Sequence, residues 1–403
     1  MSPTLFIGID VSKATHDIAI VDAEEKLLAP KFRIAESRPG YEQLRERLAQ
    51  VQQRFGATHV HFGMEATGEY WKNLYHFLKA LSPAFVLSVL HPVQTKKFSQ
   101  ADLRRAKTDP VNAFDLARFL VQKRPRPWCE RAPVWDAIKD IDRQIATFTK
   151  QHTMTLNKLR TEMAKVAPEI EHAMRTPISQ QALALLAHYP TAELLARAPM
   201  ETLLGLRYGT ARRRFAQPLL VRMKALCENS IAHKKGPGAA IVMQALLARL
   251  KHEQQAIADL KAQLLALAAE HQTPPSVLTS IKGISPETAL TLEAYIGAVQ
   301  RFPSAKQIVA FFGMNPTVYL SGASIRGVSR LEKKGSGVVR HKLFMIVLNL
   351  IRHRVEPFYG YYTRLVSRGK PKLVALTATM RKLLVIMYAM LKHQQAFEPD
   401  KKS

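Results

Sequence analysis

The chain has 403 residues, 47% of them hydrophobic, and carries 59 Lys and Arg against 32 Asp and Glu, which gives a formal net charge of +27. This length suits two or three domains with real cores and excludes a mere basic tail. A charge excess of this size repels itself unless a polyanion neutralises it, so nucleic acid is the expected partner, with a merely basic surface as the alternative.

We expect a cytoplasmic protein without membrane contact. No uninterrupted apolar run approaches the roughly 20 residues that span a bilayer, and the N-terminal sequence lacks the basic-then-apolar order of a signal peptide. The two cysteines, Cys129 and Cys227, supply neither a disulfide framework nor a zinc finger, which fits a reducing compartment.

Residues 1–128 are expected to form an α/β domain. Short apolar runs predict strands at residues 4–10, 17–22, 31–35, 58–64 and 84–90. Longer periodic segments predict helices at residues 40–55 and 66–81. Three opening strands followed by alternating helices and strands indicate an RNase H-like mixed sheet flanked by helices.

Residues 129–275 are expected to be a helical, coiled-coil-like region. Apolar residues three and four apart run from Ile138 to Phe148 and again from Met243 to Leu267, where Glu253 is the only break. These stripes indicate a helical hairpin or an intermolecular coiled coil, and ordinary core helices remain an alternative. The second stripe is a candidate oligomer contact.

An arginine-rich segment lies between the two stripes. Arginines beside Tyr208 and Phe215 suit phosphate contact and base stacking, although a solvated basic loop is nearly as plausible. The arginines assigned to nucleic-acid binding here are Arg212, Arg213 and Arg214.

Residues 276–393 are expected to form a mainly helical last domain, followed by a disordered tail at 394–403. The sequence IKGIS at 281–285, before a helix, is typical of the glycine turn of a helix–hairpin–helix, which directs backbone N–H groups at a phosphate. Cations suited to holding a phosphodiester follow. Those assigned to nucleic-acid binding are Arg326, Arg330, Lys333, Lys334, Arg340, Lys370 and Lys372.

Three isolated carboxylates are candidate Mg²⁺ ligands. Asp10 ends a buried strand, where a carboxylate is costly without a cation or hydrogen-bond donors. Glu65 ends another strand, at the sheet edge where ligands of α/β folds gather. Asp109 precedes Pro110, so helix capping competes with metal binding as its role. Asn112 shares a helix face with Asp109, and its amide oxygen can also coordinate Mg²⁺.

Several motifs occur in one order along the chain. They are GIDVSK at 8–13, MEATGEYW at 64–71, KTDPVNA at 107–113, KGISPETA at 282–289, FPSAKQIVAFFGMNP at 302–316, LSGAS at 320–324 and KKGSGVVRHKLF at 333–344. This set resembles the DEDD transposases of bacterial insertion sequences, a group whose members include bridge-RNA-guided recombinases. The likeness covers nearly all of the first and last domains.

The resemblance implies a RuvC-like domain whose acidic set falls on Asp10, Glu65, Asp109 and position 112. Asn112 stands there in place of the usual Asp. It also implies a nucleophilic serine, which by the SG motif is Ser321, and a structured guide RNA from the element. The residues alone do not distinguish this serine from its neighbours in similar polar sequence.

The function expected is site-specific DNA recombination through a covalent phosphoserine. Strand exchange needs several active sites held together, so we expect a dimer that pairs into a tetramer on DNA. One alternative is a RuvC-like, Mg²⁺-dependent endonuclease in which Ser321 is only structural. Another, suggested by Asn112, is a nucleic-acid-binding protein without catalysis.

Overall fold

The computed structural model describes residues 3–66, 68–101, 113–128, 132–174, 178–317, 320–321, 325–326, 330–331 and 335–399. The chain divides into two compact units, Met1–Glu130 and Arg131–Ser403. Each unit has its own hydrophobic core and is described by itself.

The first unit contains a five-stranded mixed sheet with the strand order β3-β2-β1-β4-β5. Its strands are β1 (Thr4–Val11), β2 (Thr15–Val21), β3 (Phe32–Ala35), β4 (His59–Glu65) and β5 (Val86–Leu90). β2 pairs antiparallel with β1 and β3, whereas β4 runs parallel to β1 and β5. The mixed sheet expected from the sequence is confirmed, and it is consistent with an RNase H-like domain.

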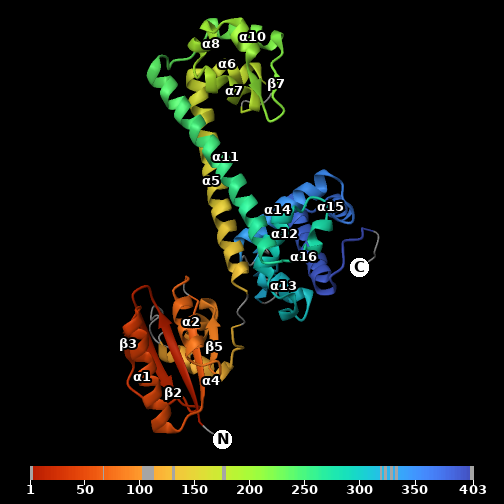
Figure 1. Cartoon of the computed structure of the whole chain (residues 1–403). Coiled ribbons are helices and arrows are strands. Elements are labelled where there is room, and N and C mark those ends of the chain that lie inside the picture. Colours follow the sequence, from red (N-terminus) through yellow and green to blue (C-terminus); the bar gives the residue numbers. More distant parts are fainter. Residues whose placement is uncertain are drawn as a thin grey trace. The chain divides into compact units, whose positions relative to one another are not determined.

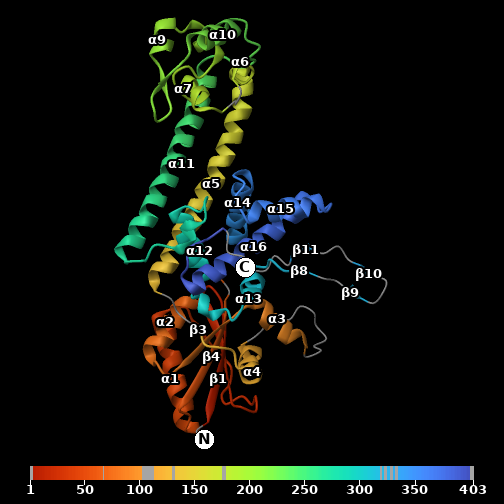
Figure 2. The same cartoon turned by 90° about the vertical axis from the view of Figure 1, so that its right-hand side faces the viewer.

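Helices cover both faces of this sheet (Figure 2). α1 (Arg38–Phe55) and α2 (Trp71–Leu81) pack on the face formed by Leu5, Ile7 and Ile9. α3 (Pro92–Ala101) and α4 (Ala113–Lys123) lie on the opposite face, where Phe6 contacts the α4 core. Because side chains alternate along a strand, residues 6, 8 and 10 of β1 share the α4 face.

The second unit is built around two long antiparallel helices, α5 (Pro133–Val166) and α11 (Pro237–Glu270) (Figure 1). Ile138 near the start of α5 packs with Leu264 near the end of α11, and Leu159 and Met243 meet in the core at the other end. The helical-hairpin interpretation is therefore confirmed. Met243, Leu246, Leu250 and Leu264 of the second stripe are buried within the chain, whereas Ile257, Leu260 and Leu267 are half-buried. The oligomer contact expected at this stripe stays a prediction.

Glu253, the one break in the apolar stripe, is buried within the hairpin. Its Oε1 accepts hydrogen bonds from Thr155 Oγ1 of the other helix, at 3.0 Å, and from Arg249 Nε, at 2.9 Å. These donors compensate the burial of one carboxylate oxygen, whereas Oε2 is buried without a hydrogen bond from the described residues.

A small helical cluster joins the two long helices at one end. Its elements are α6 (Pro168–Ala173), α7 (Gln180–His188), α8 (Ala192–Arg197), α9 (Met200–Gly205), β6 (Arg207–Tyr208), β7 (Arg213–Arg214) and α10 (Gln217–Glu228). Its core includes the fully buried Leu185, Leu186 and Leu220 together with residues of α5 and α11. β6 and β7 pair antiparallel as a short hairpin.

The C-terminal part of the second unit is mainly helical. Its elements are the 3₁₀ helices η1 (Val277–Ser280) and η2 (Val299–Arg301), the helices α12 (Pro286–Ile296), α13 (Ala305–Phe311), α14 (Gly337–Arg352), α15 (Phe358–Ser367) and α16 (Lys372–His393), and the strands β8 (Pro316–Thr317), β9 (Leu320–Ser321), β10 (Ile325–Arg326) and β11 (Arg330–Leu331). Between η1 and α12, Gly283 has φ +97°, a conformation that favours glycine. The glycine turn expected here is thus present. The element that precedes it, η1, is a short 3₁₀ helix and not the first α-helix of a helix–hairpin–helix.

Two features of the C-terminal end differ from expectation. In the described residues α16 is the one helix with the length and apolar composition of a membrane span, but Leu383, Leu384 and Met387 are fully buried in the C-terminal core, as in a core helix. The tail was expected to be disordered from residue 394. Phe397 instead stacks on Phe358, with ring centroids 5.7 Å apart, and packs against that core.

Candidate functional site

Asp10 and Glu65 lie side by side at the carboxyl ends of two neighbouring parallel strands. Ile9 of β1 is in register with Met64 of β4, so the next residue of each strand is Asp10 and Glu65. Both side chains point to the sheet face that α4 covers, because each is one residue on from a side chain in the opposite core. The structure thus brings together two of the four residues predicted to bind metal.

These two carboxylates share a crowded, negatively charged environment. Burial raises the pKa of Asp10, and the nearby Glu65 and Asp17 carboxylates raise it further. Asp17 is the antiparallel partner of Asp10 and is itself neutralised by Arg33, whose Nε and Nη2 donate at 2.8 and 2.9 Å. Glu65 Oε2 accepts a hydrogen bond from Thr95 Oγ1 of α3, at 2.7 Å. Asp10 therefore carries a charge that its protein neighbours oppose.

Gly8 lets the start of α4 approach β1 closely. A Cβ atom at Gly8 would lie 2.0 Å from the Ala113 carbonyl oxygen and 2.4 Å from the Ala117 nitrogen. Only a residue without a side chain permits this backbone approach. The first described residues of α4 are thus fixed on the strand that carries Asp10.

Asp109 and Asn112 lie outside the described residues, a few positions before Ala113 along the chain. Asp115, in the first turn of α4, is buried and accepts a hydrogen bond from Ser99 Oγ of α3, at 3.3 Å. That contact belongs to the packing of α3 on α4.

The donor chemistry of Asp10 and Glu65 fits Mg²⁺. Mg²⁺ prefers oxygen ligands and is commonly held by one or two carboxylates, and a cation here would relieve the repulsion that raises the pKa of Asp10. Within the described ranges, no group of three or more Asp, Glu, His or Cys side chains converges on one point. Two carboxylates are therefore the described part of this candidate site.

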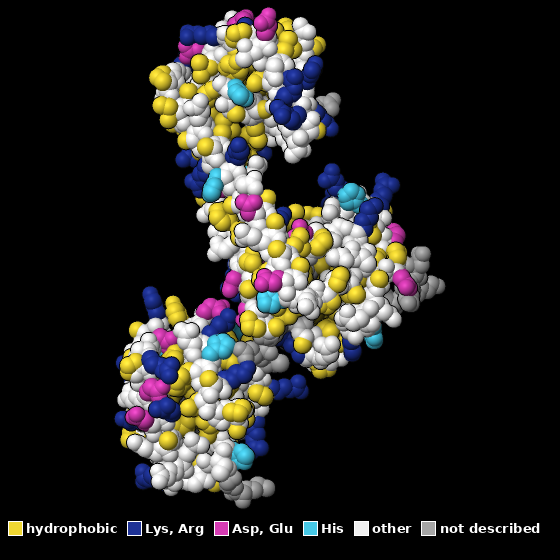
Figure 3. Space-filling view, in the orientation of Figure 1, with side chains coloured by type: hydrophobic (Ala, Val, Ile, Leu, Met, Phe, Trp, Pro, Cys, Tyr) yellow, Lys and Arg dark blue, Asp and Glu magenta, His cyan; other side chains and the backbone are white. Residues whose placement is uncertain are grey.

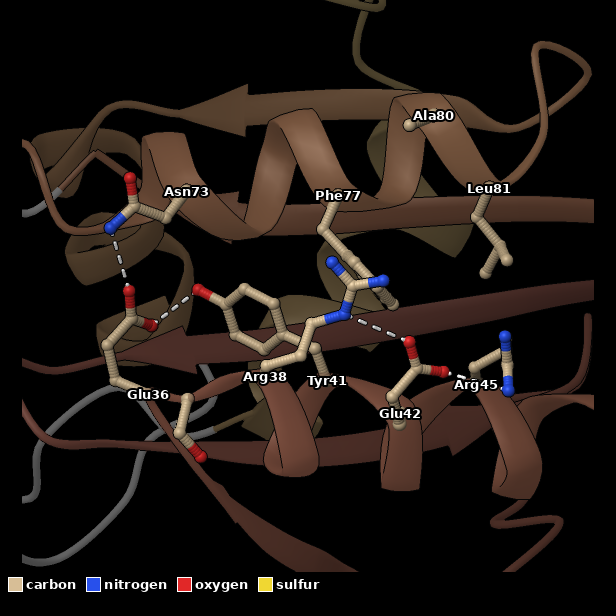
Figure 4. Close-up of a pocket in the computed structure, with 10 residues that line it drawn as sticks. Glu36, Arg38, Tyr41, Glu42, Arg45, Asn73, Phe77, Ala80 and Leu81 are labelled. Carbon is tan, nitrogen blue, oxygen red and sulfur yellow. Dashed lines mark hydrogen bonds and ion pairs between the residues drawn. The ribbon is translucent and has the colours of Figure 1, made fainter.

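A cavity of about 640 Å³ lies elsewhere, between α1 and α2 on the opposite face of the sheet (Figure 4). Glu42 forms ion pairs there with Arg38 and Arg45, at 3.2 and 2.9 Å. Glu36 accepts hydrogen bonds from Tyr41, at 2.6 Å, and Asn73, at 2.9 Å. Because its charges are paired internally, this cavity is a weaker candidate for phosphate chemistry than the half-buried pair Asp10 and Glu65.

Ser321 lies in a β-ribbon of the second unit. Ser321 of β9 pairs with Ile325 of β10, and Thr317 of β8 pairs with Arg330 of β11. The chain therefore runs out along β8 and β9 and returns along β10 and β11. Arg326 and Arg330, assigned to nucleic-acid binding, therefore lie on the returning strands. Lys333, Lys334 and the side chains of the ribbon residues are outside the described part of the chain.

Two cations that follow this ribbon in the sequence form contacts within the protein. Arg340 Nη1 donates to the Phe312 and Gly335 carbonyl oxygens, both at 3.2 Å, so this predicted nucleic-acid contact also fixes the loop before α14. Lys342 Nζ lies 2.7 Å from Asp142 Oδ1, a buried carboxylate of α5. Lys342 is thus neutralised within the chain.

The other predicted cations are exposed. Lys370 and Lys372 face solvent between α15 and α16. Lys and Arg side chains also gather on the surface over the β6–β7 hairpin (Figure 3), where Arg212, Arg213 and Arg214 are all exposed.

The aromatic residues near that hairpin have a different role from the one predicted. Phe215 is buried in the core of the small helical cluster, and Tyr208 packs against it with ring centroids 4.9 Å apart. The base-stacking role predicted for Phe215 is therefore wrong, whereas the arginines remain available for phosphate contact.

Sequence reasoning missed three residues that shape the acidic site: Gly8, Asp17 and Thr95. A signal for Asp17 was present, because Asp10 and Asp17 flank a short turn between two strands and so face each other. Gly8 and Thr95 act through packing between distant segments, which no local pattern indicates.

Two family models match the chain. The DEDD transposase model of IS110 elements, described as "Transposase", matches residues 7–168, and the model described as "Transposase IS116/IS110/IS902 family" matches residues 276–363. The first contains the paired carboxylates and the second contains Ser321.

Relatives align over nearly the whole chain. The pilin gene-inverting protein of Moraxella lacunata is 24% identical over 398 residues, 99% of this chain and 98% of the relative. The insertion element IS110 uncharacterized 43.6 kDa protein of Streptomyces coelicolor is 25% identical over 405 residues, covering 98% and 95% of the two chains. The transposase for insertion sequence element IS1111A of Coxiella burnetii is 27% identical over 161 residues, 39% of this chain and 43% of the relative. Since the two matched segments together cover more than half of the residues, this chain belongs to the IS110 family of insertion-sequence transposases.

Proposed function

We propose that this transposase is a site-specific recombinase that cuts and rejoins DNA through a covalent phosphoserine on Ser321, with a Mg²⁺-binding acidic site in its first unit. The observation that carries the proposal is the pairing of Asp10 and Glu65 at the carboxyl ends of β1 and β4, where the pKa of Asp10 is raised. Like-charged carboxylates held together are costly unless a cation binds them.

Asp10 and Glu65 are proposed as ligands, with Asp109 and Asn112 completing the set. Thr95 orients Glu65 by donating to one of its oxygens, as partners of ligating carboxylates commonly do. Asn112 brings an oxygen but no charge, so the affinity should be lower than with four carboxylates. A bound Mg²⁺ would polarise the scissile phosphate and offset its charge.

Ser321 is the proposed nucleophile. Its Oγ forms a bond to phosphorus while one P–O bond of the DNA strand breaks, and the serine proton leaves with the freed strand hydroxyl. A hydroxyl of the second strand then attacks the phosphoserine, which restores the serine and makes the new phosphodiester. One bond is made for each bond broken, so rejoining needs no ATP.

The basic surface is proposed to hold a guide RNA and the two DNA sites. Single RNA strands can be read by base pairing while cations track the backbone. Arg212, Arg213 and Arg214 offer one exposed contact of this kind, and Lys370 and Lys372 another. A dimer that pairs into a tetramer would supply several serines at once, and the half-buried residues Ile257, Leu260 and Leu267 of α11 are a candidate part of the contact.

A covalent-trapping experiment tests the mechanism. The full-length protein is incubated with Mg²⁺, RNA transcribed from the element and labelled DNA carrying the element's ends, and is then denatured. We expect label on the protein, its loss in Ser321→Ala, and its retention in a matched Ser367→Ala variant on α15. A Ser321→Ala protein that still cleaves fully would show a RuvC-like endonuclease without serine catalysis. The absence of cleavage and of exchange by both the natural protein and Asn112→Asp would favour nucleic-acid binding without catalysis.

A further inference from the structure

A second cavity lies between α15, α16 and the C-terminal segment that follows α16. It encloses about 510 Å³, within the range of roughly 300–1,000 Å³ typical of ligand sites. One part of its lining is apolar and includes Val385, Ile386 and Met390 of α16. Such a wall can cover the flat face of a planar ring.

Cations line another part of the same cavity. Arg364 of α15 lies over the Tyr361 ring, 5.3 Å from its centroid, and Lys382 of α16 lies 4.9 Å from the same centroid. Arg381 also lines the cavity. Within the described ranges, no carboxylate forms an ion pair with any of these three cations. The Tyr361 ring thus contacts two cations, Arg364 and Lys382, and Arg381 lines the same cavity.

The arrangement of these cations is unfavourable without an anion. Burial lowers the pKa of Lys382, and the positive charge of Arg364 lowers it further, while the negative charge of Glu356 acts in the opposite direction. Glu356 is partly engaged, because its Oε2 accepts a hydrogen bond from the Gly360 N–H at 3.0 Å. Glu398 also lines the cavity, as an acidic side chain that would oppose an incoming anion. An anion placed among the cations would relieve their repulsion.

A phosphate next to a flat apolar group is the chemistry of a nucleotide. We propose that this cavity binds one unpaired nucleotide of a nucleic-acid strand, with its phosphate at Arg364, Arg381 and Lys382 and its base against the apolar wall of α16. A duplex base pair is too wide and too stacked to enter, so the strand must be single there. The inference rests on the proposed function only for the source of the strand, because strand exchange and a guide RNA both expose unpaired nucleotides.

Binding measurements on the full-length protein test this pocket without any catalytic step. The probes are a fluorescent oligothymidine, the same oligonucleotide with abasic sites, an oligouridine of equal length and a blunt DNA duplex, each titrated without Mg²⁺. Ala389→Trp fills the cavity without changing any charge. Its matched control is Leu373→Trp, at an exposed position of α16 outside the cavity.

We expect wild type and Leu373→Trp to bind oligothymidine about tenfold more tightly than the abasic strand, since stacking one base contributes roughly a factor of this size or more. Ala389→Trp should lose most of this ratio and bind the duplex as wild type does. An Ala389→Trp protein with an unchanged ratio and an unchanged urea midpoint overturns the proposal. If Ala389→Trp loses more affinity for oligothymidine than for oligouridine, the pocket is assigned to DNA. If it loses more affinity for oligouridine, the pocket is assigned to RNA.

A charge test provides a second, independent variant. Arg364→Gln should weaken oligonucleotide binding about tenfold, whereas Arg368→Gln, at the residue directly after α15 and outside the cavity, should weaken it less than about threefold. Equal losses in the two variants would reduce the cavity to a general basic surface and overturn the proposal. These titrations contain no Mg²⁺ and measure no bond-breaking step, so failure of the catalytic mechanism would not be confused with failure of the pocket.

Discussion

Gly8→Ala should disable the acidic site while leaving most of the first unit folded. The added Cβ would lie 2.0 Å from the Ala113 carbonyl oxygen, where ordinary contact begins at 3.4 Å. The start of α4 must therefore move away from β1 by about 1.4 Å, because the two nearest atoms, the Ala113 oxygen and the Ala117 nitrogen, belong to the backbone and no rotamer change can remove them.

The structure gives the size of both effects. Overpacking a core in this way typically costs roughly 1–3 kcal/mol, so the unfolding temperature should fall by several degrees without loss of the fold. A displacement of about 1 Å among groups that position a reacting phosphate can reduce the rate about 100-fold. We therefore expect recombination to fall much more than stability.

The assay is Mg²⁺-dependent recombination of a plasmid that carries the element's ends, together with thermal unfolding with and without Mg²⁺. Gly63→Ala is the graded control, because its Cβ meets only the Leu120 side chain, at 2.7 Å, which can partly turn away. Gly238→Ala, which meets nothing within 4 Å, is the neutral control. If Gly8→Ala recombines within about threefold of wild type and keeps the Mg²⁺-induced rise in unfolding temperature, the inferred coupling of α4 to the acidic site is refuted.

Three further predictions concern charges. Asp10→Asn should raise the unfolding temperature at pH 7 in EDTA. A carboxyl group whose pKa is raised on folding contributes stability below its ordinary pKa, and this stability is lost as the pH rises through the raised pKa. The gain in unfolding temperature should therefore vanish below about pH 4, and a gain independent of pH would contradict this cause. Lys342→Met should lower the free energy of unfolding in urea by about 3–5 kcal/mol, because the Asp142 carboxylate stays buried without its ion-pair partner. The double variant with Asp142→Leu should recover most of that loss. A single variant within about 1 kcal/mol of wild type would argue against a buried pair. Asn112→Asp should strengthen Mg²⁺ binding about tenfold or more, seen by titration calorimetry, and an unchanged affinity would remove position 112 from the ligand set.

The sheet and its two carboxylates were predictable because the relevant signals are local. Short continuous apolar runs locate β1 and β4, and a charged residue directly after each run places Asp10 and Glu65 at strand ends. The helix predicted from residue 66 begins instead at Trp71, because Gly68 has φ +58° and lies in a turn. Local pattern located the element but not the bend that precedes it.

Features that depend on distant partners could not be read from the sequence. The apolar stripe of α11 is the same whether its partner is α5 or another copy of the chain, so periodicity left both open. Lys342 lies in the same basic motif as Lys333, Lys334 and Arg340, and only the fold shows Asp142, 200 positions earlier, beside it. Phe215 likewise carries no local mark that distinguishes a core ring from a stacking platform.

The polar contact inside the α5–α11 hairpin also limits how this molecule can move. If one helix slipped past the other by a turn, about 5.4 Å, Glu253 would leave Thr155 and lose that cross-helix hydrogen bond in a buried position. Such sliding would cost kilocalories at a single layer, so the two helices are locked in register along their length. Any change in distance between the two ends of the hairpin must therefore come from bending of the helices and not from sliding of one helix along the other.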